Sequence, residues 1–325
     1  MKMIFSKKYI LSGFLGLLFC VNSEAQSPQI KFAMPGLYPE GVTFNSKNNL
    51  FYVSSVTTGT IGTVDMKGNY KPFYTDSLLK STYGLKIDPK QNRLWACVSD
   101  ANYSKFSDST TFKKMGRMIA IDLTTGKKVQ ETDLAKEYPG KHFINDMAFD
   151  TEGNLYVTDS FSPVVYKIGK DGKATVFAES DWFKSEDIGL NGIAYSGKGY
   201  LVVNNNSSGA LYKIDMKDPK NISRIKIKNL FPGADGMLFD EAGNLILVQN
   251  KSVDKVHQLL STDNWQTAEV KASTAATDRY QQPSTGTLMK DQIYVLNSKM
   301  NELADPVKRP SKEFSLQLVQ FKPAK

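Results

Sequence analysis

A unit of about 45 residues recurs six times along the chain, and this repeat restricts the possible fold more than any other feature. Each copy opens with a short polar motif, continues with an apolar pair, and reaches a tetrad of β-forming residues after a turn. The second residues of the six motifs are Gly41, Gly84, Asp146, Gly192, Gly236 and Gly286. Successive motifs lie about 43 to 62 residues apart, a spacing typical of the four-stranded blades of a β-propeller.

Apolar and polar residues alternate within each copy, which predicts short antiparallel strands joined by tight turns such as Gly153-Asn154. A β-sandwich also contains many short strands, but it lacks six matched units of this length. We therefore predict an all-β chain folded as a six-bladed β-propeller with four-stranded blades. Either Gln29–Met34 or Phe314–Phe321 is expected to complete the last blade, so that the two termini close the ring and leave no open edge.

The first residue of every motif is expected at one end of the central channel, because the innermost strands of a propeller line that channel. Around the ring these positions hold Glu40, Tyr83, Asn145, Asn191, Asp235 and either Ser284 or Thr285. Four of the six carry carboxylate or amide oxygens, and none carries sulfur or imidazole. Oxygen ligands favour Ca²⁺ or Mg²⁺ over Zn²⁺ or Cu²⁺. The pattern therefore predicts a hard divalent cation, Ca²⁺ or else Mg²⁺, in the channel.

The same motifs admit a simpler interpretation, because Asn-Gly and Asp-Gly are ordinary turn dipeptides. A single Asn191-Gly192 pair is typical of a turn. Turn chemistry does not, however, require such polar pairs to recur at one phase of a repeat, and it does not require both carboxylates to share one ring. The repetition therefore favours a metal site.

The motifs also carry a family resemblance. Glu40-Gly41, Asn145-Asp146, Asn191-Gly192-Ile193 and Ala234-Asp235-Gly236-Met237, in this order, resemble the gluconolactonase/regucalcin-like (senescence marker protein) propellers. They also resemble diisopropylfluorophosphatase and, more distantly, the paraoxonases. The resemblance covers about residues 35–300. It implies that Glu40, Asn191 and Asp235 are metal ligands, and that Asn145 is either a ligand or an amide that positions the substrate.

What the resemblance implies for chemistry is a metal-dependent hydrolase of a lactone or ester, with phosphotriesters as a side activity. A metal with an open position polarises a carbonyl oxygen and orients water. Asp235 is the candidate base or nucleophile. His142 lies three residues before Asn145 and is a second candidate base, although a surface or inter-strand histidine is the commoner outcome. No Gly-x-Ser-x-Gly elbow is present, so a serine triad is not supported.

Residues 1–25 resemble a secretory signal peptide, with an early basic segment, a short apolar run over Tyr9–Val21 and the small residues Ser23 and Ala25 before the expected cut. A lipoprotein interpretation through Cys20 is weakened by the bulky Phe19 before it. We therefore expect a secreted or periplasmic protein whose mature domain is residues 26–325. No later apolar run is long enough to span a membrane.

The charge pattern also limits the possible partners. The chain has a formal net charge of +8, but its lysines are scattered through turns and do not form a basic face, so nucleic-acid binding is not expected. Cys97 lies in an apolar strand and is expected to be a buried core residue. We expect a monomer that binds a small lactone or ester.

Two questions remain open at this level. The longest interval between motifs contains a polar stretch, residues 99–116, which is either a floppy loop or a cap over the channel mouth. The second question is the function itself, because propellers are common binding scaffolds. The alternative to a hydrolase is a non-catalytic propeller whose metal is structural and whose loops bind a ligand or a protein.

Overall fold

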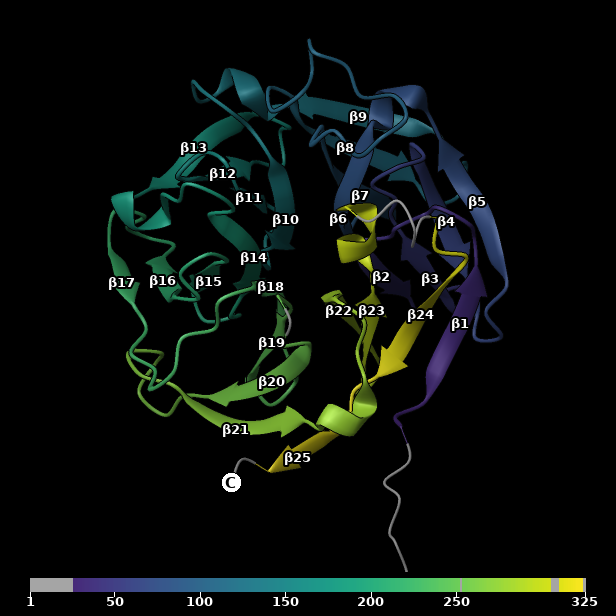
Figure 1. The fold of residues 1–325 in the computed structure, drawn as a ribbon. Coiled ribbons are helices and arrows are strands. Elements are labelled where there is room, and N and C mark those ends of the chain that lie inside the picture. The colour runs from purple at the N-terminus through teal and green to yellow at the C-terminus, as the bar shows by residue number, and fades with distance from the viewer. Residues whose placement is uncertain (1–25, 252, 305–309, 324–325) are drawn as a thin grey trace, which may run out of the picture.

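The computed structural model describes residues 26–251, 253–304 and 310–323, and within them the chain forms six antiparallel sheets arranged around a ring (Figure 1). The predicted six-bladed β-propeller is therefore confirmed. The signal peptide predicted for residues 1–25 lies outside the described residues.

Each blade contains four strands that run in order from the channel to the rim. Blade 1 contains β2 (Val42–Asn45), β3 (Leu50–Val53), β4 (Thr60–Val64) and β5 (Tyr70–Thr75). Blade 2 contains β6 (Ser81–Ile87), β7 (Arg93–Ser99), β8 (Gly116–Asp122) and β9 (Lys128–Asp133). Blade 3 contains β10 (Ile144–Phe149), β11 (Leu155–Asp159), β12 (Val164–Ile168) and β13 (Ala174–Glu179). Blade 4 contains β14 (Leu190–Tyr195), β15 (Tyr200–Asn205), β16 (Leu211–Asp215) and β17 (Ile222–Arg224). Blade 5 contains β18 (Ala234–Phe239), β19 (Leu245–Gln249), β20 (Lys255–Leu260) and β21 (Glu269–Thr274). Blade 6 contains β22 (Pro283–Met289), β23 (Gln292–Asn297), β24 (Glu313–Leu318) and β1 (Gln29–Ala33).

Short 3₁₀ helices are the only helical segments of the described residues, and four of them connect one blade to the next. They are η1 (Ser77–Leu79), η2 (Leu134–Lys136), η3 (Asp181–Phe183) and η4 (Ala276–Asp278); a fifth, η5 (Met300–Ala304), follows β23. In η1 the side chain of Asp76 accepts a hydrogen bond from the backbone N–H of Leu78 and so caps the first turn. The buried side chain of Leu79 then anchors this crossover in the core.

The two termini close the ring as the sequence predicted. Strand β1 pairs antiparallel with β24, with Gln29 opposite Gln317 and Ala33 opposite Glu313, so the first described strand is the outermost strand of blade 6. The chain then continues into β25 (Phe321–Pro323), which pairs with β21 and adds a fifth strand to blade 5. Both pairings satisfy strand edges that would otherwise be exposed.

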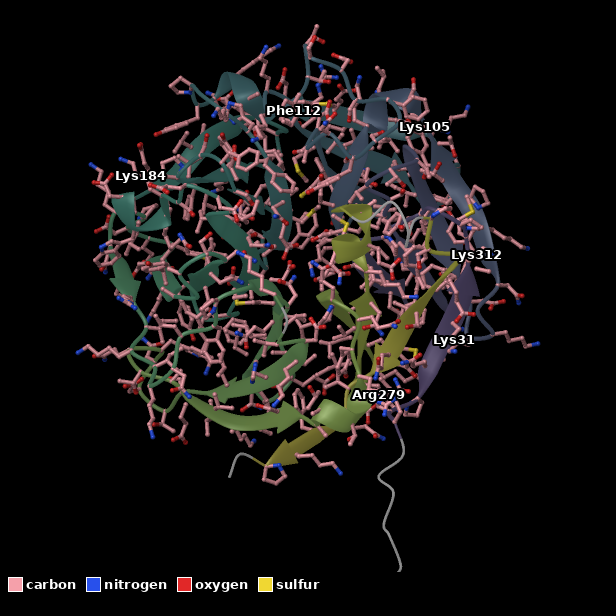
Figure 2. All side chains as sticks on the ribbon, in the orientation of Figure 1. Lys31, Lys105, Phe112, Lys184, Arg279 and Lys312 are labelled. Carbon is pink, nitrogen blue, oxygen red and sulfur yellow. The ribbon has the colours of Figure 1, made fainter. Side chains whose placement is uncertain are left out.

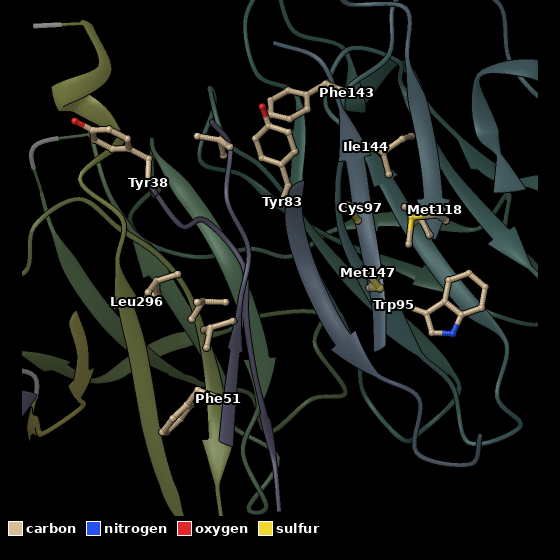
Figure 3. Close-up of a cluster of buried hydrophobic side chains, with 14 of the residues drawn as sticks. Tyr38, Phe51, Tyr83, Trp95, Cys97, Met118, Phe143, Ile144, Met147 and Leu296 are labelled. Atoms are coloured by element: carbon tan, nitrogen blue, oxygen red, sulfur yellow. The ribbon is translucent and has the colours of Figure 1, made fainter. Parts of the chain in front are cut away.

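The core lies between the blades, where the apolar face of one sheet packs against the next. Figure 3 shows part of its largest cluster, to which Cys97, Met118 and Met147 contribute sulfur. Cys97 is fully buried, as predicted. The ring of Phe51 lies 5.5 Å from that of Tyr294, so aromatic packing joins blade 1 to blade 6 across the closure. A fully buried phenylalanine contributes about 1.5–3 kcal/mol of hydrophobic stabilisation.

Basic side chains are distributed around the outer edge of the ring. Figure 2 shows Lys31, Lys105 and Lys184 well apart on the molecule. Lys31 pairs with Glu313 at 3.4 Å and Lys184 pairs with Asp181 at 2.5 Å, both in exposed positions that contribute little stability. Among the helices of the described residues, none has the length and apolar character needed to cross a membrane.

Candidate metal and substrate site in the channel

A β-bulge interrupts the innermost strand of five blades at the polar motif. The shifts in register fall at residues 83–84, 145–146, 191–192, 235–236 and 284–285. In blade 1 the motif Glu40-Gly41 directly precedes β2. A bulge bends its strand and re-aims a side chain, and bulges are common beside functional sites. The five motifs therefore lie inside strands, and the turn interpretation of Asn191-Gly192 is wrong.

Glycine at the second motif position allows neighbouring inner strands to approach closely. A Cβ atom on Gly192 would lie 2.2 Å from the carbonyl oxygen of Asp235 in the next blade, and one on Gly41 would lie 2.1 Å from the carbonyl oxygen of Tyr83. Neither glycine has a positive φ, so the requirement is for space and not for backbone conformation. These contacts fix the separation between the side chains that face the channel.

The four predicted metal ligands line one cavity of about 320 Å³ at the channel mouth. Glu40, Asn145, Asn191 and Asp235 come from four different blades, and each is at least nine-tenths buried. Tyr83 and Ser284, which occupy the two remaining ring positions, line the same cavity. The other lining residues are Tyr103, Phe143, Ile188, Asn206, Asn250, Lys251, Gln282, Ser298, Met300 and Asn301.

A second ring of polar residues was missed by the sequence analysis. It consists of the residue that directly follows the second strand of each blade: Ser54, Asp100, Ser160, Asn206, Asn250 and Ser298. Ser54 Oγ accepts hydrogen bonds from the N–H groups of Glu40 (3.2 Å) and Gly41 (2.7 Å). The signal was available, because a polar residue recurs at this phase of every repeat.

Two members of the second ring orient first-ring side chains, and a third holds the backbone of blade 5 next to Asp235. Asn145 donates from Nδ2 to Ser160 Oγ at 2.9 Å. Asn250 donates from Nδ2 to Oδ2 of Asp235 at 2.5 Å, and Asn206 donates to the carbonyl oxygen of Ala234 at 2.8 Å. Each of these hydrogen bonds is donated by an amide nitrogen. The amide oxygens of Asn145 and Asn206 therefore take no part in them. The second ring thereby fixes which atoms are available in the channel.

Four amide or carboxylate oxygens of the cavity are buried and have no hydrogen-bond partner in the described residues. They are Oδ1 of Asn145, Asn191, Asn206 and Asp235. Buried polar atoms are paired in the great majority of cases, so four unpaired acceptors in one cavity require an explanation. Carboxylate and amide oxygens are the ligands of hard cations. The donor set therefore fits a divalent cation such as Ca²⁺.

The carboxyl groups of the cavity are strongly perturbed. Burial raises the pKa of Glu40 well above its ordinary value, and the nearby carboxylates of Asp235 and Asp146 raise it further. Burial also raises the pKa of Asp235 to about 8, with Asp146 adding to the shift and the hydrogen bond from Asn250 opposing it. Both shifts arise because carboxylates are withdrawn from water next to like charges. A bound dication would supply the missing positive charge.

The site is not a cluster of acidic, histidine or cysteine ligands. Within residues 26–251, 253–304 and 310–323, no three His, Cys, Asp or Glu side chains come together in a way that could hold a metal ion. The ring instead combines the two carboxylates of Glu40 and Asp235 with the amides of Asn145 and Asn191. Amide oxygens are ordinary ligands of Ca²⁺, so a mixed set of this kind remains compatible with that ion.

His142, the second candidate base, is not among the residues that line the cavity. Its side chain is buried, and Nδ1 lies 2.8 Å from Oδ2 of Asp159 and 3.5 Å from the hydroxyl of Tyr166. Oδ1 of Asp159 also accepts the N–H of Phe143 at 2.8 Å, so the histidine belongs to a network that holds the connection into β10. The structure thus brings Asp235 together with the predicted ligands, and places His142 outside the residues that line the cavity.

The stretch 99–116 contributes to the cavity through Tyr103. Asp100 organises the loop: it accepts hydrogen bonds from Ser107 Oγ at 2.6 Å, from Thr111 Oγ1 at 2.7 Å and from the N–H of Asn102 at 2.9 Å. These hydrogen bonds hold the pKa of Asp100 below its ordinary value although burial opposes them. Of the two interpretations left open, the structure favours the cap, because the loop is internally bonded and supplies a wall residue.

Comparison with known proteins places the chain among propellers of this type. The family described as Mal s 1 allergenic protein-like matches residues 21–279. Diisopropyl-fluorophosphatase from Loligo vulgaris is 30% identical over 158 residues, which are 40% of this chain and 50% of that protein. Lactonase drp35 from Staphylococcus haemolyticus is 27% identical over 208 residues, or 61% of this chain and 58% of the relative. The chain thus spans only about half the length of the curated relatives that it matches.

A solved structure shows the same fold. The crystal structure of the major Malassezia sympodialis allergen Mala s 1 superimposes with a TM-score of 0.71 at 18% identity, covering 90% of this chain and 96% of that one. At this identity the likeness establishes the fold alone. The similarity to diisopropyl-fluorophosphatase and to a lactonase confirms the resemblance drawn from the motifs.

Proposed function

The chain belongs to the Mal s 1 allergenic protein-like family, and from that premise we propose that it is a calcium-dependent hydrolase of lactones or esters that acts in the channel cavity. The observation that carries the proposal is the convergence on one cavity of four buried amide and carboxylate oxygens that have no hydrogen-bond partner among the described residues. The names of two relatives, a lactonase and a fluorophosphatase, support hydrolysis of a lactone or a related ester. Phosphotriesters are included as a further substrate class on the same basis.

The residues that would hold the cation are Glu40, Asn145, Asn191 and Asp235, with Asn206 as an additional oxygen donor. When bound, Ca²⁺ would supply a Lewis acid beside the scissile carbonyl and balance the two carboxylates. The second ring would keep these oxygens in place before substrate arrives, so that little reorganisation is needed during the reaction.

Asp235 is the residue that we propose as the base. Asn250 holds Oδ2 at 2.5 Å, while Oδ1 belongs to a cavity-lining side chain and has no hydrogen-bond partner in the part of the chain that the structure describes. A carboxylate held on one side and free on the other is suited to take a proton from water or to attack the carbonyl carbon. His142 contacts Asp159 and lies outside the lining, which makes it the weaker candidate for the same role.

The decisive experiment measures Ca²⁺ binding and turnover separately. Purified protein is titrated with Ca²⁺ by calorimetry and assayed on aryl esters, lactones and phosphotriesters, with Ca²⁺ and with EDTA. We expect turnover that EDTA abolishes and Ca²⁺ restores. Glu40→Gln should weaken Ca²⁺ binding at least 10-fold, whereas Glu313→Gln, on the outer strand β24, should leave it unchanged.

The outcomes distinguish the two functions considered. Turnover that survives EDTA would contradict the role of the metal. Ca²⁺ binding that depends on Glu40 without turnover of any substrate would contradict the hydrolase, and would leave a binding propeller with a structural metal.

Export is proposed as well, on the signal-like residues 1–25. Protein recovered from the periplasm or the culture medium should begin at Gln26 when its N-terminus is sequenced. Recovery of the uncleaved chain from the cytoplasm alone would contradict this localisation.

A further inference from the structure

The phenol of Tyr83 is the unusual member of the first ring. It stands at the motif position of blade 2, where the neighbouring blades 1 and 3 carry Glu40 and Asn145. Its side chain is 1% exposed and lines the cavity, yet its hydroxyl makes no hydrogen bond of normal length and angle in the described residues. The nearby side chain of Ser81 interacts with the phenol, but Ser81 already donates its own hydroxyl to the carbonyl oxygen of Val56 at 2.6 Å. A buried hydroxyl without a hydrogen bond loses its hydration without compensation, so this position is maintained at a cost to stability.

The phenol is also held firmly. Its ring packs edge-to-face on Phe143, with centroids 4.4 Å apart and planes at 68° (Figure 3). Phe143 in turn packs against Phe161 at 5.3 Å. The following residue, Gly84, is so close to blade 3 that a Cβ atom there would lie 2.7 Å from the carbonyl oxygen of Asn145. These contacts hold the ring of Tyr83 in place at the wall of the cavity.

Tyr83 differs from its neighbours because its hydroxyl can donate a hydrogen bond. The other buried cavity atoms without a partner in the described residues are amide or carboxylate oxygens, which accept hydrogen bonds or bind cations. Ser284, the remaining first-ring side chain, already donates its hydroxyl to the carbonyl oxygen of Glu40 at 2.6 Å. A phenol is protonated at neutral pH and can donate a hydrogen. It is thus the one unpaired buried donor that the described cavity provides.

We propose that Tyr83 donates a hydrogen bond to the substrate oxygen that becomes negatively charged during hydrolysis. This role rests on the proposed hydrolase function and adds a protein donor to it. An acceptor-rich ring binds a cation but repels the oxygens of an ester, so a fixed donor beside it gives the substrate a defined orientation. A preorganised donor of this kind stabilises developing negative charge and costs no reorganisation.

The test replaces the hydroxyl and keeps the ring. Tyr83→Phe retains the packing on Phe143 and removes only the donor. Tyr70→Phe is the matched control, because the Tyr70 hydroxyl is also buried and without a hydrogen bond to any described residue, but lies on β5, the outermost strand of blade 1. Because an unpaired buried hydroxyl is removed, both variants should unfold at the wild-type temperature or slightly above it.

Two readouts separate a substrate contact from a structural role. On a substrate that the wild type hydrolyses, Tyr83→Phe should lower kcat/KM by about 10- to 100-fold, mainly through kcat, while Tyr70→Phe leaves it unchanged. In calorimetric titrations with phenylphosphonate, whose tetrahedral anion mimics the intermediate, Tyr83→Phe should bind about 10-fold more weakly in the presence of Ca²⁺.

Each outcome decides the proposal. If Tyr83→Phe keeps both kcat/KM and phosphonate affinity within twofold of the wild type, the donor role is wrong. If no ester or lactone is hydrolysed but phosphonate binding weakens in Tyr83→Phe alone, the hydrolase proposal fails and the donor role stands for a bound oxyanion. If the wild type neither hydrolyses a substrate nor binds the phosphonate, both proposals fail.

Discussion

The close approach of the inner strands leads to a sharp prediction at Gly192. In Gly192→Ala the new methyl carbon would lie 2.2 Å from the carbonyl oxygen of Asp235 and 2.8 Å from Nδ2 of Asn204. Carbon contacts are normally about 3.5 Å long, so the two strands have to separate by roughly 1 Å. The atom in the way is backbone and cannot rotate aside. Forcing extra volume into a packed core costs about 1–3 kcal/mol, and we expect a value of about 3.

That cost converts into a measurable shift. With an unfolding entropy of about 2.1 cal/mol/K for each of roughly 300 residues, 3 kcal/mol lowers Tm by about 5 °C. Because Asp235 is the group displaced, Ca²⁺ affinity should fall by at least 10-fold in the same variant. Differential scanning calorimetry and calorimetric Ca²⁺ titration measure the two effects on one preparation.

Gly286→Ala is the matched control at the same motif position of blade 6. Its Cβ atom would meet nothing closer than 3.2 Å, so a shift of a few tenths of an ångström accommodates it. We expect its Tm to fall by less than about 2 °C. If Gly192→Ala unfolded within that margin as well, glycine would not be setting the spacing of the ring, and the account of how the motif builds the site would be refuted.

Two further predictions concern charge and the cap. Without metal, Asp235 and Glu40 have pKa values raised above those of the unfolded chain, so the folded state binds more protons than the unfolded state. The free energy of unfolding should therefore fall as pH rises from about 4 through about 8. Ca²⁺ should remove this dependence, and thermal unfolding measured in EDTA and in Ca²⁺ tests it. Unfolding that is independent of pH in EDTA would contradict the burial of these charges. Asp100→Ala leaves the hydroxyls of Ser107 and Thr111 without their acceptor and should destabilise the cap by roughly 2 kcal/mol. Limited proteolysis should then cut residues 99–116 faster than in the wild type, and an unchanged rate would show that Asp100 does not hold the loop.

The repeat made most of this fold predictable. A polar motif before a β-rich tetrad recurs once in each blade, and its phase identified Glu40, Asn145, Asn191 and Asp235 as neighbours in space. The physical device that turns them into the channel, a β-bulge, could not be predicted, because register is a property of two paired strands and one strand's sequence does not display it.

Other features depended on contacts that short-range patterns do not contain. Asn250 follows a strand and resembles an ordinary loop residue, whereas it hydrogen-bonds Asp235, fifteen residues away. His142 is close to Asn145 along the chain, and proximity in sequence suggested the channel mouth. It precedes the strand, however, and its partner Asp159 lies at the end of β11, on the other side of the wall. Such pairings follow from the packing of two segments.

The closure of blade 6 makes the ends of the chain depend on each other. Strand β24 lies between β1 and β23, so β1 reaches the rest of its sheet only through a strand that is synthesised after β2 to β23. Five blades can pair their own strands in the order of synthesis, while Gln29–Ala33 has to remain without a partner until Glu313–Leu318 has been made. Deletion of Glu313–Leu318 would therefore remove the partner of the first described strand and leave the ring open.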